Sequence, residues 1–149
     1  MSLIIRNATA ADMQAVFNLI VELAIYEKAP NEVINTPDQL IKDGFGNQPL
    51  FVCFVAESDG NIVGMSLNYI RYSTWKGAVL YLEDLIVTES YRGKGIGKAL
   101  FQHTLQYASQ NGYQRLQWQV LDWNQPAIDF YKTFQADFDP EWLNAWINL

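Results

Sequence analysis

Residues 92–97 read Arg92-Gly93-Lys94-Gly95-Ile96-Gly97 and join an apolar, strand-like segment to a long amphipathic segment with helical spacing. Alternating glycines let backbone N–H groups turn towards one point, because no Cβ atoms clash there. The start of the following helix adds a partial positive charge, and Lys98 adds a formal charge to those of the loop. The stretch therefore predicts an anion site suited to a diphosphate.

Two familiar nucleotide loops do not fit this stretch. A Walker A loop has four residues between its glycines and then Lys followed by Ser or Thr, whereas here three residues separate Gly93 from Gly97 and Ala99 follows Lys98. A Rossmann loop has Gly-x-Gly-x-x-Gly early in a βαβ unit, whereas this Gly-x-Gly-x-Gly lies late in the chain. A purely structural turn at a helix start remains an open alternative.

Upstream of the loop, the N-terminal third of the chain predicts one strand and two helices. Leu3–Asn7 is typical of a strand, and Thr9–Asp12 resembles a capping box with Asp in place of Glu. The apolar residues that follow recur at helical spacing: Met13, Val16, Phe17, Ile20, Val21 and Ala24. Thr36-Pro37 predicts the start of a second, shorter helix, which we expect Gly44 to stop.

Three strands are predicted between that helix and the loop. Leu50–Glu57 is an almost continuous apolar run, which is typical of a central strand. The turn signal Ser58–Asn61 joins it to Ile62–Tyr72 as a hairpin. Val79–Val87 is the strand that leads towards the glycine loop.

The second half of the chain alternates helix and strand. We expect a helix over Gly95–Asn111, a strand over Gln114–Leu121, a helix from the Asn124 cap to Phe134, and short strands within Ala136–Leu149. This order predicts an α/β fold with a mixed, mostly antiparallel central sheet flanked by about four helices. No linker or repeat interrupts it, so residues 1–149 are expected to form a single domain.

Composition narrows the class of protein. A net charge of −6 argues against a nucleic-acid partner and favours a cationic one. The one cysteine, Cys53, excludes an intrachain disulfide and suits a cytoplasmic protein, in which we expect it to be a buried structural thiol. No metal site is expected with a single His and a single Cys, and His103 is expected to pack along its helix. Apolar runs fall short of the ~20 residues of a membrane helix, so no membrane partner is expected.

Arg-x-x-Gly-x-Gly ahead of a long helix resembles the acetyl-CoA signature of the GNAT acetyltransferases, and the surrounding segments match that superfamily in order along essentially the whole chain. Within it, the chain resembles the diamine (spermidine/spermine) N1-acetyltransferase group, which includes thialysine acetyltransferases. The segments that carry this are Tyr81–Leu85, Tyr91–Gly93, Trp123–Pro126 and Phe130–Lys132. The group also has equivalents of Leu23–Glu27, Asp43–Gly46 and Trp75.

The resemblance implies a GNAT fold, acetyl-CoA as cosubstrate, and transfer of its acetyl group to a primary amine of a small polyamine, diamine or lysine-like molecule. It also implies a homodimer. Two alternatives stay open: a GNAT enzyme with another acceptor, such as a protein amine or an aminoglycoside, and a non-catalytic acyl-CoA-binding module.

Roles follow from the same resemblance. Glu83 would help to deprotonate the amine through water, and Tyr131 would be the general acid that protonates the CoA thiolate. The implied coenzyme-binding residues are Leu85, Ile86, Val87, Arg92, Gly93, Lys94, Gly95, Ile96, Gly97, Lys98, Asn124, Tyr131 and Lys132. The implied substrate-binding residues are Tyr26, Glu27, Trp75, Glu83 and Asp84, an acidic and aromatic set suited to an alkylammonium.

Several of these residues also have a purely structural interpretation. Strand alternation places Glu83 and Asp84 on opposite faces unless a bulge intervenes, and an acid near a strand edge is often only solvated. Tyr131 also suits a packed core position, and Asn124 suits a helix cap. Gln135 stands where the group has Gly after the tyrosine helix, at a cost of roughly 1 kcal/mol if its backbone is left-handed. Glu141–Leu149 matches the group poorly.

Overall fold

The computed structural model describes residues 2–149, which fall into two compact units. The first unit ends at Trp118, and the second runs from Gln119 to Leu149.

A five-stranded sheet forms the centre of the first unit, with strand order β1-β2-β3-β4-β5. The strands are β1 Leu3–Asn7, β2 Val52–Ser58, β3 Asn61–Ser73, β4 Gly77–Val87 and β5 Leu116–Trp118. The first four pair antiparallel in sequence order, whereas β5 pairs parallel to β4. The predicted mixed, mostly antiparallel sheet is confirmed, and β2 is an interior strand as expected.

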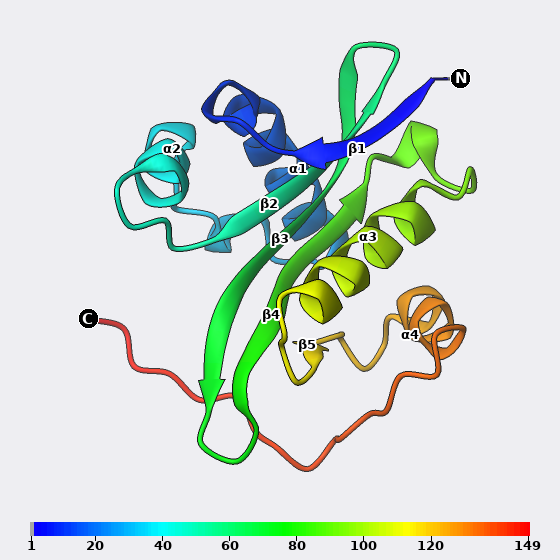
Figure 1. The fold of residues 1–149 in the computed structure, drawn as a ribbon. Coiled ribbons are helices and arrows are strands. Elements are labelled where there is room, and N and C mark those ends of the chain that lie inside the picture. The colour runs from blue at the N-terminus through cyan, green and yellow to red at the C-terminus, as the bar shows by residue number, and fades with distance from the viewer. Residues whose placement is uncertain (1) are drawn as a thin grey trace. The chain divides into compact units, whose positions relative to one another are not determined.

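Helices cover both faces of this sheet (Figure 1). The helices of the first unit are α1 Met13–Tyr26, α2 Pro37–Phe45 and α3 Ile96–Gln110, with short 3-10 turns η1 Ala10–Asp12, η2 Pro30–Glu32 and η3 Glu89–Tyr91. One buried cluster joins α1 and α2 to the sheet through Met13, Val16, Leu19, Leu40, Cys53, Val55, Met65, Leu67 and Ile86. A second cluster joins α3 to the opposite face through Phe54, Ala56, Val63, Ile96 and Leu100.

Two hairpins shape the middle of the sheet. At the first, Asp59 and Gly60 have φ values of 50° and 84°, as a tight two-residue hairpin loop requires, so the predicted turn is confirmed. The second hairpin, β3–β4, is longer than its neighbours. Pairing between β2 and β3 ends at Asn68, and β3 continues beyond it to Ser73, so the tip projects past β2 (Figure 1).

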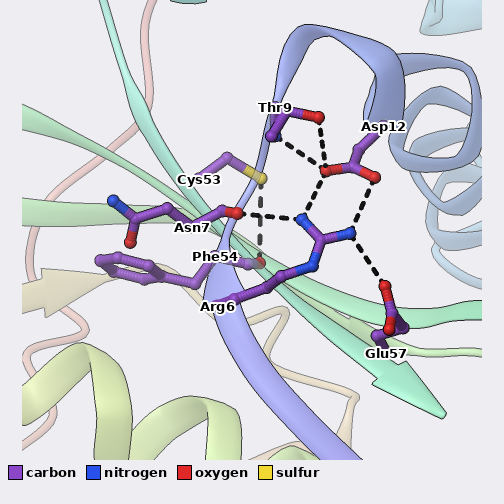
Figure 2. Close-up of polar contacts among 7 residues, drawn as sticks. All are labelled: Arg6, Asn7, Thr9, Asp12, Cys53, Phe54 and Glu57. Carbon is purple, nitrogen blue, oxygen red and sulfur yellow. Dashed lines mark hydrogen bonds and ion pairs between the residues drawn. The ribbon is translucent and has the colours of Figure 1, made fainter.

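Arg6 holds β1 to two other segments (Figure 2). Its guanidinium donates to both oxygens of Asp12 at 2.8 and 3.1 Å and to Glu57 at 3.0 Å. The Asp12 carboxylate also accepts from the Thr9 backbone N–H at 2.8 Å. Asp12 therefore forms the predicted return bond of the capping box and, at the same time, ties the entry of α1 to the edge strand.

The sequence predicted that Gly44 would end the second helix, and this prediction is wrong. The helix α2 passes through Gly44 to Phe45. A Cβ atom built at Gly44 would collide with the ring of Phe51. The glycine is therefore needed so that the Phe51 ring can pack closely against α2, rather than for a left-handed stop.

The second unit contains helix α4, Gln125–Lys132, and no strand among its described residues. Asn124 caps α4 by accepting from the Ala127 N–H at 3.3 Å, as predicted. The predicted strand over Gln114–Leu121 is shortened to β5, and the short strands expected within Ala136–Leu149 are absent from the structure's residues 119–149. Pro140 has no N–H to donate, and a strand requires a hydrogen-bonded neighbour that this segment lacks.

Candidate active site

The glycine loop lies between η3 and α3, where the sequence predicted it. Gly93 and Gly95 have φ values of 75° and 80°, a left-handed conformation that strains any residue with a Cβ. Gly97 differs, because it lies within α3 and a Cβ there would sit 3.7 Å from Val87, an ordinary contact. Two of the three glycines are therefore required by the backbone of the loop itself, and the third is not.

The loop is open to an anion. Residues 92–95 are exposed, and Gly95, the N-cap of α3, has no side chain with which to cap the first turn. The first-turn amides and the helix dipole thus point to a solvent-accessible position. Lys98 is exposed on this turn, and the Lys94 ammonium lies 5.0 Å from the centre of the Tyr91 ring.

Arg92 turns towards α1. Its Nε donates to the Val87 carbonyl at 2.8 Å, and its Nη2 donates to Glu22 at 3.2 Å. Its guanidinium carbon lies 5.5 Å from the centre of the Tyr26 ring. The cation over Tyr26 is therefore Arg92, although the sequence suggested Tyr26 for a substrate ammonium.

A β-bulge lies in β4 between the tip of the hairpin and the loop. Asp84 opposes Leu67 and Leu82 opposes Asn68, so Glu83 is the extra residue between them. The strict alternation of Glu83 and Asp84 across the sheet, expected unless a bulge intervened, is therefore interrupted. Glu83 is exposed and Asp84 is half-buried, so the bulge places two adjacent carboxyl groups in different environments.

The carboxyl group of Asp84, at the bulge, has a strongly raised pKa. Burial raises its pKa to about 7, and the nearby charges of Glu83 and Glu27 act in the same direction. Burial also raises the pKa of Glu27, which follows the last residue of α1. A bound cation would relieve this repulsion, so the three acids favour an ammonium group as ligand.

One edge of β4 is unpaired between the bulge and the loop. β5 pairs only with Leu80–Leu82, and the other side of Leu85–Val87 pairs with β3. Among residues 2–118, no strand covers this edge beyond Leu82. An extended ligand could add to this edge as a strand. Coenzyme contact at Leu85, Ile86 and Val87 stays a prediction.

Trp75 is not brought to the acids. It lies at the tip of the β3–β4 hairpin with 84% of its surface exposed. Ser73, at the tip, lies five positions along β3 from Asn68, which is beside the bulge. At ~3.4 Å a residue this is roughly 17 Å along the strand, so Trp75 and Glu27 do not line one pocket.

Cys53 and His103 have structural surroundings, as the sequence indicated. Cys53 is buried, and burial raises the pKa of its thiol to about 12. A thiolate nucleophile is therefore absent at neutral pH. His103 packs edge-on against Phe54, with ring centres 4.6 Å apart.

Three of the suggested site residues belong to the second unit. Tyr131 is buried within α4, Asn124 is its N-cap, and Lys132 is exposed at its last turn. Asp122 is exposed ahead of the cap.

Glu22 was missed by the sequence analysis. Its carboxylate contacts Thr88, Glu89 and Arg92, all of which lie more than 60 residues further along the chain. The available signal was a lone acid within the otherwise apolar run Leu19–Ile25.

Metal ligands do not gather in residues 2–149: no group of three His, Cys, Asp or Glu side chains there could hold an ion. Nor, over the same residues, is any helix both long and apolar enough to cross a bilayer.

Sequence comparison identifies the family. Residues 14–135 match the model of the acetyltransferase (GNAT) family. The chain belongs to this family. It is 40% identical over 143 residues to a thialysine N-epsilon-acetyltransferase of Sus scrofa, which covers 91% of this chain and 84% of the relative. It is 37% identical over 134 residues to spermidine/spermine N(1)-acetyltransferase-like protein 1 of Homo sapiens, covering 85% of this chain and 19% of that protein. This GNAT chain is therefore an N-acetyltransferase.

Structural comparison gives the same fold. An aminoglycoside acetyltransferase from an uncultured soil metagenomic sample superposes with a TM-score of 0.80 at 24% identity, covering 99% of this chain and 96% of the other. At that identity the similarity establishes the GNAT fold and no acceptor. The predicted fold class and family are both confirmed.

Proposed function

We propose that this enzyme transfers the acetyl group of acetyl-CoA directly to a primary amine of a small polyamine, diamine or lysine-like molecule, within a ternary complex. The observation that carries this is the course of β4 (Figure 1). Three features follow one another along β4 and the segment after it. They are the acids at the bulge, the unpaired edge at Leu85–Val87 and the anion loop at residues 92–98. The names of the similar acetyltransferases support an amine acceptor of this kind.

The acids at the bulge address the main chemical obstacle. An alkylamine with a pKa near ~10 is mostly protonated at neutral pH and cannot attack a thioester until it loses a proton. Asp84, whose pKa is about 7, is suited to accept that proton near neutral pH. Glu83, which is exposed, and Glu27 would hold the ammonium, and Glu83 would pass the proton through water.

The coenzyme would use the remainder of the same strand. We place its diphosphate at the amides and lysines of residues 93–98 and its pantetheine chain along Leu85, Ile86 and Val87. A backbone N–H of this edge would stabilise the oxyanion formed when the amine attacks the thioester carbonyl. Arg92 would act mainly on the shape of the loop, because its guanidinium already pairs with Glu22.

The departing thiolate needs a proton, and we assign that role to Tyr131. Support comes from its match to the resembled group and from its burial within a helix capped by Asn124. Asn124 and Lys132 remain proposed coenzyme contacts. Tyr131→Phe should lower kcat by about 100-fold with little change in the Kd for acetyl-CoA; an unchanged kcat at saturating amine would remove this assignment.

Three further properties are proposed with this function: residues 1–149 act as a single GNAT domain, the enzyme works in the cytoplasm, and it is a homodimer. The match over residues 14–135, which includes parts of both compact units, supports the first. The buried single cysteine agrees with a reducing compartment. The dimer rests on the family resemblance.

The deciding experiment is a thiol-release assay with acetyl-CoA across a panel of acceptors. The panel contains spermidine, putrescine, thialysine, lysine, an aminoglycoside and a peptide with a free N-terminus. We expect the highest kcat/KM among the small amines and lysine analogues. A preference for the peptide or the aminoglycoside would contradict the acceptor class. CoA binding with no thiol release on any amine would indicate a non-catalytic module.

A further inference from the structure

Glu22 of α1 contacts three successive points on the approach to the anion loop. Its Oε1 accepts from the Thr88 hydroxyl at 2.7 Å. Its Oε2 accepts from the Glu89 backbone N–H at 3.1 Å and from Arg92 Nη2 at 3.2 Å. One carboxylate thus joins the end of β4, the start of η3 and the first residue of the glycine loop to a single helix.

Arg92 extends this connection in two directions. It donates to the Val87 carbonyl at 2.8 Å, which fixes the loop to the last residue of β4. It also lies over the Tyr26 ring, at 5.5 Å from its centre. Tyr26 is the last residue of α1, and Glu27, whose charge acts on Asp84, comes directly after it. The loop and the acid-bearing end of α1 are therefore linked by contiguous contacts.

The Glu22–Arg92 ion pair by itself does not account for this arrangement. The Glu22 and Arg92 side chains are 33% and 39% exposed, and ion pairs so exposed contribute little to folding. A carboxylate beside an anion site also repels the diphosphate and neutralises an arginine that would attract it. Through its three hydrogen bonds, Glu22 fixes the geometry of its neighbours at an electrostatic cost to anion binding.

We propose that Glu22 is a positioning residue that couples the coenzyme loop to the amine site. A diphosphate at residues 93–98 orders the loop, and the Glu22–Arg92–Tyr26 contacts transmit this order to Glu27. Coenzyme and amine then bind more tightly together than separately, and the effect is reciprocal. The inference rests on the proposed function, because it requires both ligands.

The experiment compares Glu22→Gln with Glu89→Gln. Both variants remove one negative charge beside the loop, but the exposed Glu89 side chain is not part of the connection, since only its backbone N–H contacts Glu22. The first readout is amide hydrogen exchange with and without CoA. In the wild type and in Glu89→Gln, CoA should slow exchange at residues 88–98 and also at residues 22–28. In Glu22→Gln, protection should remain at the loop and be lost at residues 22–28.

The second readout is the Kd of spermidine, measured calorimetrically with and without CoA. We expect CoA to tighten spermidine binding by about 5-fold in the wild type and in Glu89→Gln, and by less than about 2-fold in Glu22→Gln. Equal coupling in all three proteins, or wild-type protection confined to the loop, would overturn the role of Glu22 while leaving the proposed function intact. Failure of the wild type to bind CoA would instead overturn both.

Discussion

Asp84 shows how one extra residue in a strand changes the chemistry of its neighbour. Without the bulge at Glu83, two adjacent acids would alternate across the sheet. With the bulge, the Glu83 carboxyl group is exposed, whereas that of Asp84 is half-buried and has a pKa of about 7. Titratable groups tuned in this way are typical of proton-transfer sites.

The first prediction concerns the pH dependence of Asp84→Asn. In the wild type, kcat/KM should gain from ionisation of Asp84 as pH rises through about 7. We expect the wild type to be about 100-fold faster than Asp84→Asn at pH 8 and only a few-fold faster at pH 5, where Asp84 is protonated. Steady-state rates of both proteins, with Glu89→Gln as control, measure the ratio. A ratio that stays constant from pH 5 to 8 would show that Asp84 does not accept the proton.

Stability gives an independent check of the same pKa. Because the pKa of Asp84 is raised in the folded state, folding favours the neutral acid, and stability declines as pH rises from the unfolded value of 3.8 towards about 7. Asp84→Asn cannot ionise at this position, so its stability should not decline in this way. Allowing for its partial exposure, the variant should gain about 2 kcal/mol over the wild type at pH 8 and nothing at pH 4. Urea unfolding at both pH values tests the sign.

At the scale of elements, the glycines of the loop and the glycine of α3 serve different structural purposes. Gly93 and Gly95 adopt left-handed backbone conformations, so alanine there should distort the loop itself. Gly97 does not, and its missing Cβ leaves room beside Val87.

The second prediction follows from that difference. Gly95→Ala should raise the KM for acetyl-CoA by at least about 10-fold and also lower thermal stability, by about 1 kcal/mol. Gly97→Ala should leave stability unchanged or slightly higher, yet still raise that KM, because the new methyl group would meet the approaching diphosphate. Thermal unfolding and steady-state kinetics distinguish the two effects. A wild-type KM in Gly97→Ala would show that the coenzyme does not approach this residue closely.

The third prediction concerns the end of α4. Gln135 has a φ of 57°, so the left-handed turn expected of this position holds a residue with a side chain. Gln135→Gly should therefore stabilise the protein by about 1 kcal/mol and raise Tm by a few degrees. Gln106→Gly, on an exposed position within α3, should instead lower stability by about 1 kcal/mol. If both variants lost stability equally, strain at Gln135 would be negligible.

Local signals predicted most elements, because each depends on a few neighbouring residues. The Thr36 and Asn124 caps, the Asp59-Gly60 turn and the glycine loop all lie where the sequence indicated. Gly44 was misinterpreted because its reason, contact with the Phe51 ring, lies in the tertiary packing. Glu22 was missed because its partner Thr88 is 66 residues away. The strands expected after Ala136 had no identifiable pairing partner, and pairing is what makes a strand.

At the scale of the molecule, charge and acceptor chemistry agree. The chain has a net charge of −6, and the acids at the bulge add a local negative field. Such a field concentrates cationic substrates and repels anionic ones.

The fourth prediction tests this field with salt. Raising ionic strength from about 0.02 to 0.2 M should raise the KM for spermidine several-fold and leave kcat nearly unchanged, since screening weakens attraction but not the bound geometry. An acceptor with a single charge, such as a monoamine, should change less. Initial rates in NaCl provide the data. A KM for spermidine that does not respond to salt would exclude a role for long-range attraction.

The bridge at Arg6 has a consequence for the way the molecule comes apart in acid. Its guanidinium holds the pKa of Asp12 below the usual range, so this bridge stabilises the fold above the unfolded pKa and fails as pH drops through the folded one. Protonation of Asp12 would release Arg6, and with it β1, from the entry of α1, whereas the bond from Arg6 to Glu57 of β2 would remain. Acid should therefore fray the molecule from its N-terminal border inward, and β1 should exchange its amide hydrogens before the interior strands do.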